Sequence, residues 1–146
     1  MDDADRHNEE IYETRVIDSD LKQAEEPKRE ILDEVRRCRF RDDETFAIKL
    51  ALEEVLCNAV KHGNKNDASK RVTIRFAVTP GCCEIIVRDE GPGFVPDAVP
   101  DPTSPDRLPL PNGRGIMLLR AYMDEVEYRD NGREVYFMKR SSGGPG

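Results

Sequence analysis

The chain has 146 residues, enough for one domain with one hydrophobic core. Charged residues make up 36% of it and the net charge is −7. We therefore expect no direct nucleic-acid binding and no membrane binding, because phosphate backbones and anionic lipids repel such a surface. No apolar run approaches the roughly 20 residues that span a bilayer, and the acidic N-terminus does not resemble a secretory leader.

The four cysteines do not have the spacing of a zinc site. They are Cys38, Cys57 and the adjacent Cys82 and Cys83. Because cytosolic thiols are kept reduced, we interpret them as free thiols of a cytoplasmic protein. No redox role is expected for the adjacent pair.

The first part of the chain predicts a strand and a helix. Residues 1–10 are polar and are expected to be flexible, and a roughly alternating run at 11–17 predicts a strand. Proline is tolerated in the first turn of a helix and damaging in its middle, so we expect the helix to begin at Pro27 and end near Cys38. Its charged side is predicted to face solvent, with a partner or homodimer contact as the alternative.

The second predicted helix is the clearest element. Asp42 or Asp43 is its expected N-cap, and Gly63 is expected to form a left-handed C-terminal cap. Apolar residues recur between them at helical spacing. They are Ile48, Leu52, Val55, Leu56 and Ala59.

The second half of the chain alternates between strands and loops. Runs at 71–78 and 83–89 predict two strands joined by a tight turn. A loop over 91–112 carries seven prolines and is long enough to suggest a functional lid. A short apolar helix follows "NGRG", and 125–140 predicts a hairpin around "DNG". The tail, 141–146, is expected to be flexible.

This order of elements predicts one α+β domain over 11–140. The expected fold is a two-layer α/β sandwich, with a mixed, mostly antiparallel sheet and helices on one face.

Polar residues on the second helix form the first candidate site. Glu54 and Asn58 are four residues apart and share a helix face with the small Ala47 and Ala51. Asparagine is a mediocre helix former, so its presence there calls for a reason. The choice lies between a ligand site and an ordinary solvated surface.

Two glycine-rich segments form the second and third candidates. Asp89 ends a strand and is followed by Gly91 and Gly93, which fits either a ligand site or a simple loop start. Gly113 and Gly115 open an apolar helix, and unpaired N–H groups at a helix N-terminus bind phosphate well.

Taken together, the three segments closely resemble the ATP-binding domain of the GHKL superfamily. The motifs are E-x-x-x-N-A-x-x-H-G-N, D-x-G-x-G-F and G-R-G-I-x-L-L-R-x-x-M-D-E-V-E-Y, in that order. The short length, the compact lid and "MDEVEY" most resemble bacterial anti-sigma factors with serine kinase activity. The resemblance covers roughly 11–140 and implies the histidine kinase-like ATPase fold, also called the Bergerat fold, with ATP and Mg²⁺ as cofactors.

The resemblance also implies residue roles. Asn58 corresponds to the Mg²⁺ ligand and Glu54 to the general base. Asp89 corresponds to the residue that accepts a hydrogen bond from the adenine amine. Gly91 and Gly93 would allow the base and the lid to approach closely.

Further roles fall on the lid and the third motif. Gly113, Arg114 and Gly115 correspond to the glycine box that holds the phosphates. Either Arg107 or Arg114 would neutralise the terminal phosphate. His62 is expected to be structural and not a phosphoacceptor.

The leading hypothesis is a protein serine/threonine kinase that binds a sigma factor and phosphorylates a STAS-type anti-anti-sigma protein. One alternative is an ATP-binding interaction module without catalysis. Another is the catalytic part of a split histidine kinase acting in trans. Glu54 favours phosphoryl transfer, since a binding module has no need of a base.

Overall fold

The structure is a computed structural model, and it describes residues 12–92 and 119–142. In chain order the elements are β1 (Glu13–Asp18), α2 (Leu21–Arg37), α3 (Asp42–Cys57), the π-helical turn η1 (Asn58–Gly63), β2 (Arg71–Thr79), β3 (Cys82–Arg88), β4 (Glu125–Arg129) and β5 (Glu134–Arg140). A helical turn at 119–122 precedes β4.

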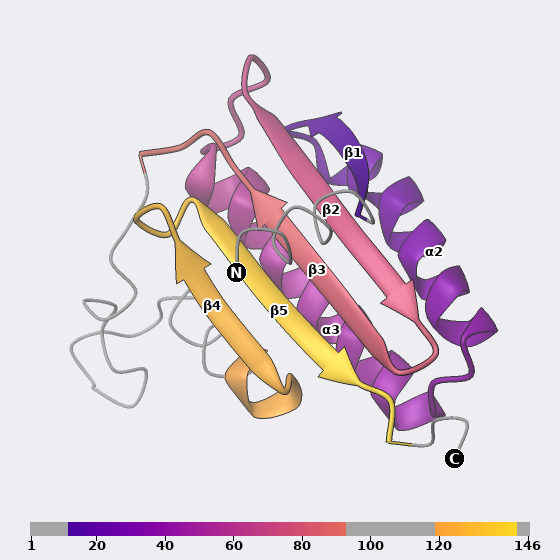
Figure 1. Ribbon diagram of the computed structural model, residues 1–146. Coiled ribbons are helices and arrows are strands. Elements are labelled where there is room, and N and C mark those ends of the chain that lie inside the picture. The colour runs from indigo at the N-terminus through magenta and orange to yellow at the C-terminus, as the bar shows by residue number, and fades with distance from the viewer. Residues whose placement is uncertain (1–11, 93–118, 143–146) are drawn as a thin grey trace, which may run out of the picture.

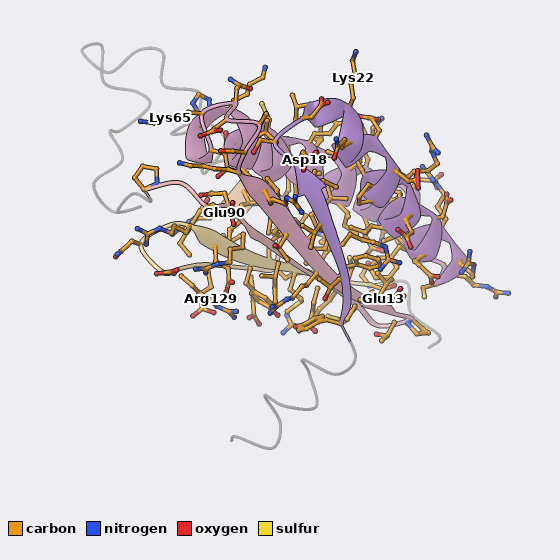
Figure 2. All side chains as sticks on the ribbon, turned by 90° about the horizontal axis from the view of Figure 1, so that it is seen from above. Glu13, Asp18, Lys22, Lys65, Glu90 and Arg129 are labelled. Carbon is orange, nitrogen blue, oxygen red and sulfur yellow. The ribbon has the colours of Figure 1, made fainter. Side chains whose placement is uncertain are left out.

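The strands form one sheet in the order β1-β2-β3-β5-β4, and every described pair is antiparallel. Helices α2 and α3 lie side by side across one face of this sheet (Figure 1). Seen from above, Lys22 projects from the helical layer and Arg129 from the sheet (Figure 2). The predicted two-layer α+β sandwich with helices on one face is confirmed.

The core fills the space between the two layers. Successive side chains of a strand point to opposite faces, so every second residue of a central strand faces the helices. Val72, Ile74 and Phe76 of β2 are buried there, at 0–2% exposure. They belong to one apolar cluster with Ile31 of α2 and Ile48 of α3. Burial of this cluster fixes which face of each helix meets the sheet.

The predicted start of the first helix is wrong, because α2 begins at Leu21 and not at Pro27. Asp20 caps it by accepting a hydrogen bond from the Lys22 N–H at 2.9 Å. Pro27 lies inside the helix on its buried face, beside Ala24. The early cap and the burial of this face compensate for the one backbone hydrogen bond that proline cannot donate.

The predicted caps of the second helix also need correction. Its N-cap is Arg41, and Asp42 and Asp43 lie in the first turn, where their charges still favour the helix dipole. Gly63 does not adopt the left-handed conformation, because the helix continues through the π turn η1 instead of ending at a glycine cap. Strands β2 and β3 and the β4–β5 hairpin agree with prediction, and the strand predicted at 11–17 is β1 at Glu13–Asp18. The start of the helix predicted after "NGRG" lies outside the described residues. In the hairpin, Asp130 and Asn131 both have positive φ, at 52° and 56°, as a type I′ turn requires.

Glu44 joins the end of the sheet to the start of α3. It is buried at 5% exposure, and its Oε1 accepts the Arg41 N–H at 2.9 Å. Its Oε2 accepts the Ser142 N–H at 2.7 Å and the Ser142 hydroxyl. Burial raises the pKa of the Glu44 carboxyl, but the hydrogen bonds from Ser142 and Arg41 outweigh it, so the pKa lies below its ordinary value.

This shift predicts a pH-dependent contribution to stability. Glu44→Gln should lower the free energy of unfolding at pH 7 by about 1–2 kcal/mol, because hydrogen bonds to a charged group are lost. The folded pKa is depressed, so the wild-type advantage is present above the unfolded pKa of about 4.3 and fades as pH falls through the folded pKa. Urea unfolding between pH 3 and 7 measures it. An equal loss for the exposed Glu26→Gln would contradict the assignment.

Candidate functional site

The C-terminal end of α3 carries the first predicted pair. Asn58 follows α3 as its C-cap, and its N–H bonds to the Glu54 carbonyl, so the two residues lie one turn apart on the same face. Both side chains are partly buried. Within residues 12–92 and 119–142, no hydrogen bond or ion pair is formed by either side chain. The Glu54 carboxylate and the Asn58 amide therefore lie on one face, and neither is paired with a residue in the described part of the chain.

Asn58 is also the first residue of the π turn η1. Single π turns in α-helices often mark functional sites, because the extra residue redirects the side chains that follow. No pattern in the sequence indicated this turn.

Asp89 directly follows β3 and lies against Gly63 at the end of η1. Its side chain is buried, with 8% exposure, and its N–H donates to the Arg133 carbonyl at 2.9 Å. Oδ1 accepts the Gly91 N–H at 2.8 Å. Oδ2 accepts no hydrogen bond from any residue that the structure describes. Asp89 thus keeps one carboxylate oxygen available in a buried setting.

This setting changes the acidity of Asp89. Burial raises the pKa of its carboxyl above the ordinary value, and the Gly91 N–H and the charge of Arg133 oppose the rise only in part. A buried carboxylate with a raised pKa is typical of a functional site, because folding alone gains nothing from it.

Two glycines bring these segments into contact. A Cβ at Gly63 would lie closer than 3.0 Å to the carboxyl carbon and both oxygens of Asp89. A Cβ at Gly91 would lie closer than 3.0 Å to the Gly63 carbonyl carbon and oxygen. Gly63 is therefore needed for close approach and not for a left-handed cap. The contact joins the first and second sequence motifs in space.

Other predicted site residues lie outside the described part of the chain, as does most of the expected lid over 91–112. They are Gly93, Arg107, Gly113, Arg114 and Gly115. Leu119, the first described residue after this gap, is buried at 3% exposure.

Sequence reasoning missed two residues beside Asp89. Asn64 is fully buried and its Oδ1 accepts the Glu90 N–H at 2.7 Å. Arg133 donates to the carbonyls of Gly91 and Pro92. Asn64 stood in the first motif without an assigned role, and nothing near Arg133 in the sequence pointed to the site.

The structure also places His62 and the four cysteines. His62 is exposed at the end of the π turn. All four cysteines are free, as expected. Burial and the charge of Glu84 raise the pKa of the Cys82 thiol to about 11, so it is not an activated thiol. Among the described residues, no helix is long and apolar enough to cross a membrane.

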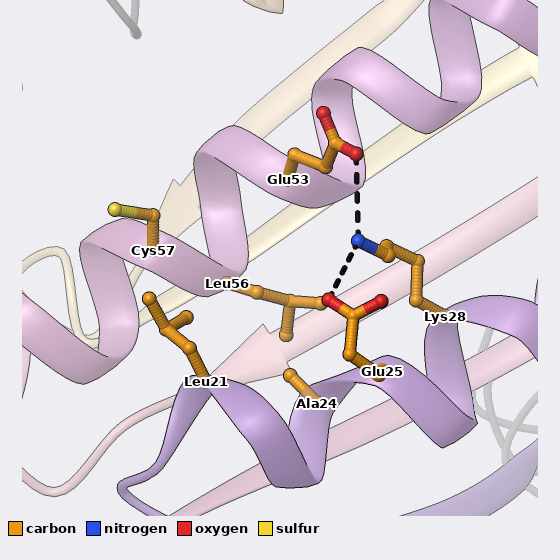
Figure 3. Close-up of a pocket in the computed structure, with 7 residues that line it drawn as sticks. All are labelled: Leu21, Ala24, Glu25, Lys28, Glu53, Leu56 and Cys57. Carbon is orange, nitrogen blue, oxygen red and sulfur yellow. Dashed lines mark hydrogen bonds and ion pairs between the residues drawn. The ribbon is translucent and has the colours of Figure 1, made fainter.

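A separate cavity of about 190 Å³ lies between α2 and α3 (Figure 3). Lys28 spans it, with its Nζ 3.0 Å from Glu25 and 3.4 Å from Glu53. None of the predicted site residues lines this cavity. Glu53 therefore faces α2, and it provides a natural comparison for its neighbour Glu54.

Residues 17–139 match the family model described as the histidine kinase-like ATPase domain. The chain belongs to this family. The predicted resemblance to the GHKL superfamily is therefore confirmed. The match spans all of the elements described above except the first residues of β1 and the end of β5.

Similar proteins include a serine-protein kinase and an anti-sigma factor, as the sequence motifs predict. The chain is 34% identical over 102 residues to the serine-protein kinase RsbW of Bacillus subtilis, covering 65% of this chain and 63% of the relative. It is 33% identical over 104 residues to the anti-sigma F factor of Geobacillus stearothermophilus, covering 66% and 70%. The chain thus spans less than two thirds of the length of the Bacillus relative.

A solved structure agrees on the fold. The RsbU and RsbW domains of a Mycobacterium tuberculosis protein match with a TM-score of 0.57 at 15% identity, covering 88% of this chain and 32% of that one. At this identity the similarity concerns the fold alone.

The close approach of the two motifs predicts which glycines tolerate a side chain. Gly91→Ala should lower the free energy of unfolding by about 1–3 kcal/mol, because the new methyl group meets backbone atoms that cannot move aside. Gly81→Ala, where nothing lies within 4 Å, should change it by less than about 0.5 kcal/mol. Thermal unfolding of both variants measures the difference. Equal values would show that the contact between Gly63 and Gly91 is not tight.

Proposed function

We propose that this chain is an ATP-dependent anti-sigma regulatory factor with protein serine/threonine kinase activity. It would act in the cytoplasm, bind a sigma factor, and transfer the γ-phosphate of ATP to a hydroxyl of a STAS-type anti-anti-sigma protein. The observation that carries the proposal is the contact of Gly63 with Asp89, which brings a buried carboxylate against the helix end that bears Glu54 and Asn58. The family match and the names of the relatives support the same activity.

Asp89 is the proposed recognition group for the base. Its Oδ2, which accepts no hydrogen bond from the described residues, would accept one from the exocyclic amine of adenine. Guanine presents a carbonyl at the same place, so two acceptors would face each other. A hydrogen bond formed in a buried site discriminates strongly, because the wrong partner leaves the buried group unpaired.

The donor set fits a magnesium nucleotide better than a metal held by protein alone. Among the described residues, no three His, Cys, Asp or Glu side chains cluster to hold a metal ion. Asn58 offers a neutral amide oxygen, and Mg²⁺ takes few protein ligands beside water and substrate phosphates. When bound, Mg²⁺ neutralises charge on the phosphates. Roles for Gly93, Arg107, Gly113, Arg114 and Gly115 at the lid and phosphates remain predictions.

Glu54 is the proposed general base. Its carboxylate would accept the proton of the partner's serine or threonine hydroxyl as the hydroxyl oxygen bonds to the γ-phosphorus. The bond from that phosphorus to the bridging oxygen breaks at the same time, and ADP leaves. In-line transfer needs the acceptor to approach from outside the pocket, which suits a loop of another protein better than His62, rooted in the same helical segment.

The assignment of Asp89 predicts opposite effects on binding and stability. Asp89→Asn should weaken ATP binding by about 1.5–3 kcal/mol, because it replaces a charged acceptor. It should also stabilise the free protein at pH 7. The folded pKa is raised, so wild-type stability is fully present below the unfolded pKa of about 3.9 and falls as pH rises through the folded pKa.

Calorimetry and urea unfolding measure the two effects. The exposed Asp33→Asn is the control and should change neither. Wild-type protein that binds ATP and GTP equally well would exclude Asp89 as the adenine acceptor.

Glu54→Ala should separate chemistry from binding. We expect ATP affinity near the wild-type value and a loss of ~10²–10⁴-fold in transfer rate, the usual contribution of a positioned base. The matched control is Glu53→Ala, which removes the neighbouring carboxylate that faces Lys28 and should retain transfer.

Labelled ATP and STAS-type proteins of the same organism provide the assay, followed by acid treatment. Phosphoserine survives acid and phosphohistidine does not. A normal rate in Glu54→Ala would exclude the base. Acid-labile label on the isolated chain, lost in His62→Ala, would favour the histidine kinase alternative.

A further inference from the structure

Side chains from two distant parts of the fold hold the four residues that follow β3, Asp89 to Pro92. Asn64 reaches them from the end of η1, and Arg133 reaches them from the hairpin between β4 and β5. Neither residue belongs to the proposed chemistry. Both act on the backbone that carries Asp89.

Asn64 uses its whole side-chain amide. Its Nδ2 donates to the Ser19 Oγ at 2.7 Å and to the Arg71 carbonyl at 2.9 Å, and its Oδ1 accepts the Glu90 N–H at 2.7 Å. Ser19 in turn donates to the Lys70 carbonyl. A flipped amide would set donor against donor and acceptor against acceptor, so this buried group has one orientation.

Arg133 holds both ends of the same segment. Its carbonyl accepts the Asp89 N–H at 2.9 Å. Its Nε donates to the Gly91 carbonyl at 2.9 Å and its Nη2 to the Pro92 carbonyl at 3.0 Å. Nη1 is fastened to Asp130, which also pairs with Arg88. The planar fork of a guanidinium suits two neighbouring carbonyls, which a lysine ammonium cannot reach together.

The backbone of this segment therefore has no spare donors. The N–H of Asp89 bonds to Arg133, that of Glu90 to Asn64, and that of Gly91 to Asp89 itself. Pro92 has no N–H to offer. With Gly63 closing the space behind the carboxylate, the position of Asp89 is set within the protein itself.

We propose that Asn64 and Arg133 are positioning residues that fix Asp89 and thereby determine the preference for adenine over guanine. The inference rests on the proposed function. A carboxylate discriminates between an amine and a carbonyl only while it is held in place. Once released, it can turn away from the guanine carbonyl or admit a water molecule between them, so ATP loses affinity and GTP loses little.

The main test is Arg133→Met in the full chain, with ATP and GTP affinities measured by calorimetry. We expect ATP affinity to fall about 5–20-fold and the ratio of ATP to GTP affinity to fall by a similar factor. Arg133→Lys should recover part of the ratio. The control is Arg129→Met on the same hairpin, whose guanidinium pairs with Glu127 and Glu134 and should leave the ratio unchanged.

A second measurement needs no nucleotide. Hydrogen exchange at the Asp89, Glu90 and Gly91 amides should accelerate about tenfold or more in Arg133→Met but not in Arg129→Met. Asn64→Ser should accelerate exchange of the Glu90 amide most strongly. Circular dichroism checks that this variant is folded.

The two proposals fail in different ways. Wild-type protein that binds neither nucleotide would overturn the proposed function, and the exchange rates would still test whether the segment is held. Wild-type selectivity that survives in Arg133→Met, or exchange rates unchanged by that variant, would overturn the positioning role alone.

Discussion

The site depends on one steric constraint, the absence of a side chain at Gly63. The turn that ends α3 passes so close to Asp89 that a single methyl group would overlap its carboxylate. The packing of α3 against the sheet makes this approach possible, because Ile48, Leu52 and Val55 bury one face of the helix in the core. The core thus sets where α3 ends, and Gly63 allows that end to meet the strand that carries Asp89.

The proposed recognition of adenine would explain why the fold keeps a buried carboxylate that lowers its stability. Asp89 is a buried carboxylate whose raised pKa shows that its ionised form is unfavourable in the free protein. It persists because the surrounding backbone is over-determined, with bonds from Asn64 and Arg133 on either side. Strain or unmet polarity of this kind is concentrated at functional sites and is offset by packing elsewhere. The largest such packing among the described residues is the apolar cluster between the sheet and both helices.

Local patterns predicted much of the fold. Strands β2 and β3, helix α3 and the β4–β5 hairpin each followed from periodicity or turn residues, which act within a few positions along the chain. The rule against proline inside a helix predicted a start at Pro27, whereas α2 begins at Leu21 with Asp20 as its cap. Asn64 and Arg133 could not be assigned from sequence, since their partners lie 26 and 42 positions away and are set by the tertiary fold. The same holds for Gly63, where a local rule predicted a helix cap. The structure shows that glycine is needed there because the Asp89 carboxylate lies too close for a side chain.

Recognition of adenine by Asp89 is tested by an NMR titration of its carboxyl in the free protein and in its complexes with nucleotide. We expect a pKa above the ordinary aspartate value in the free protein, caused by burial. The pKa should be lower with ATP than with inosine triphosphate, because only adenine carries the amine that donates to the ionised form. An Asp89 pKa that is the same in both complexes would contradict direct recognition of adenine by this carboxylate.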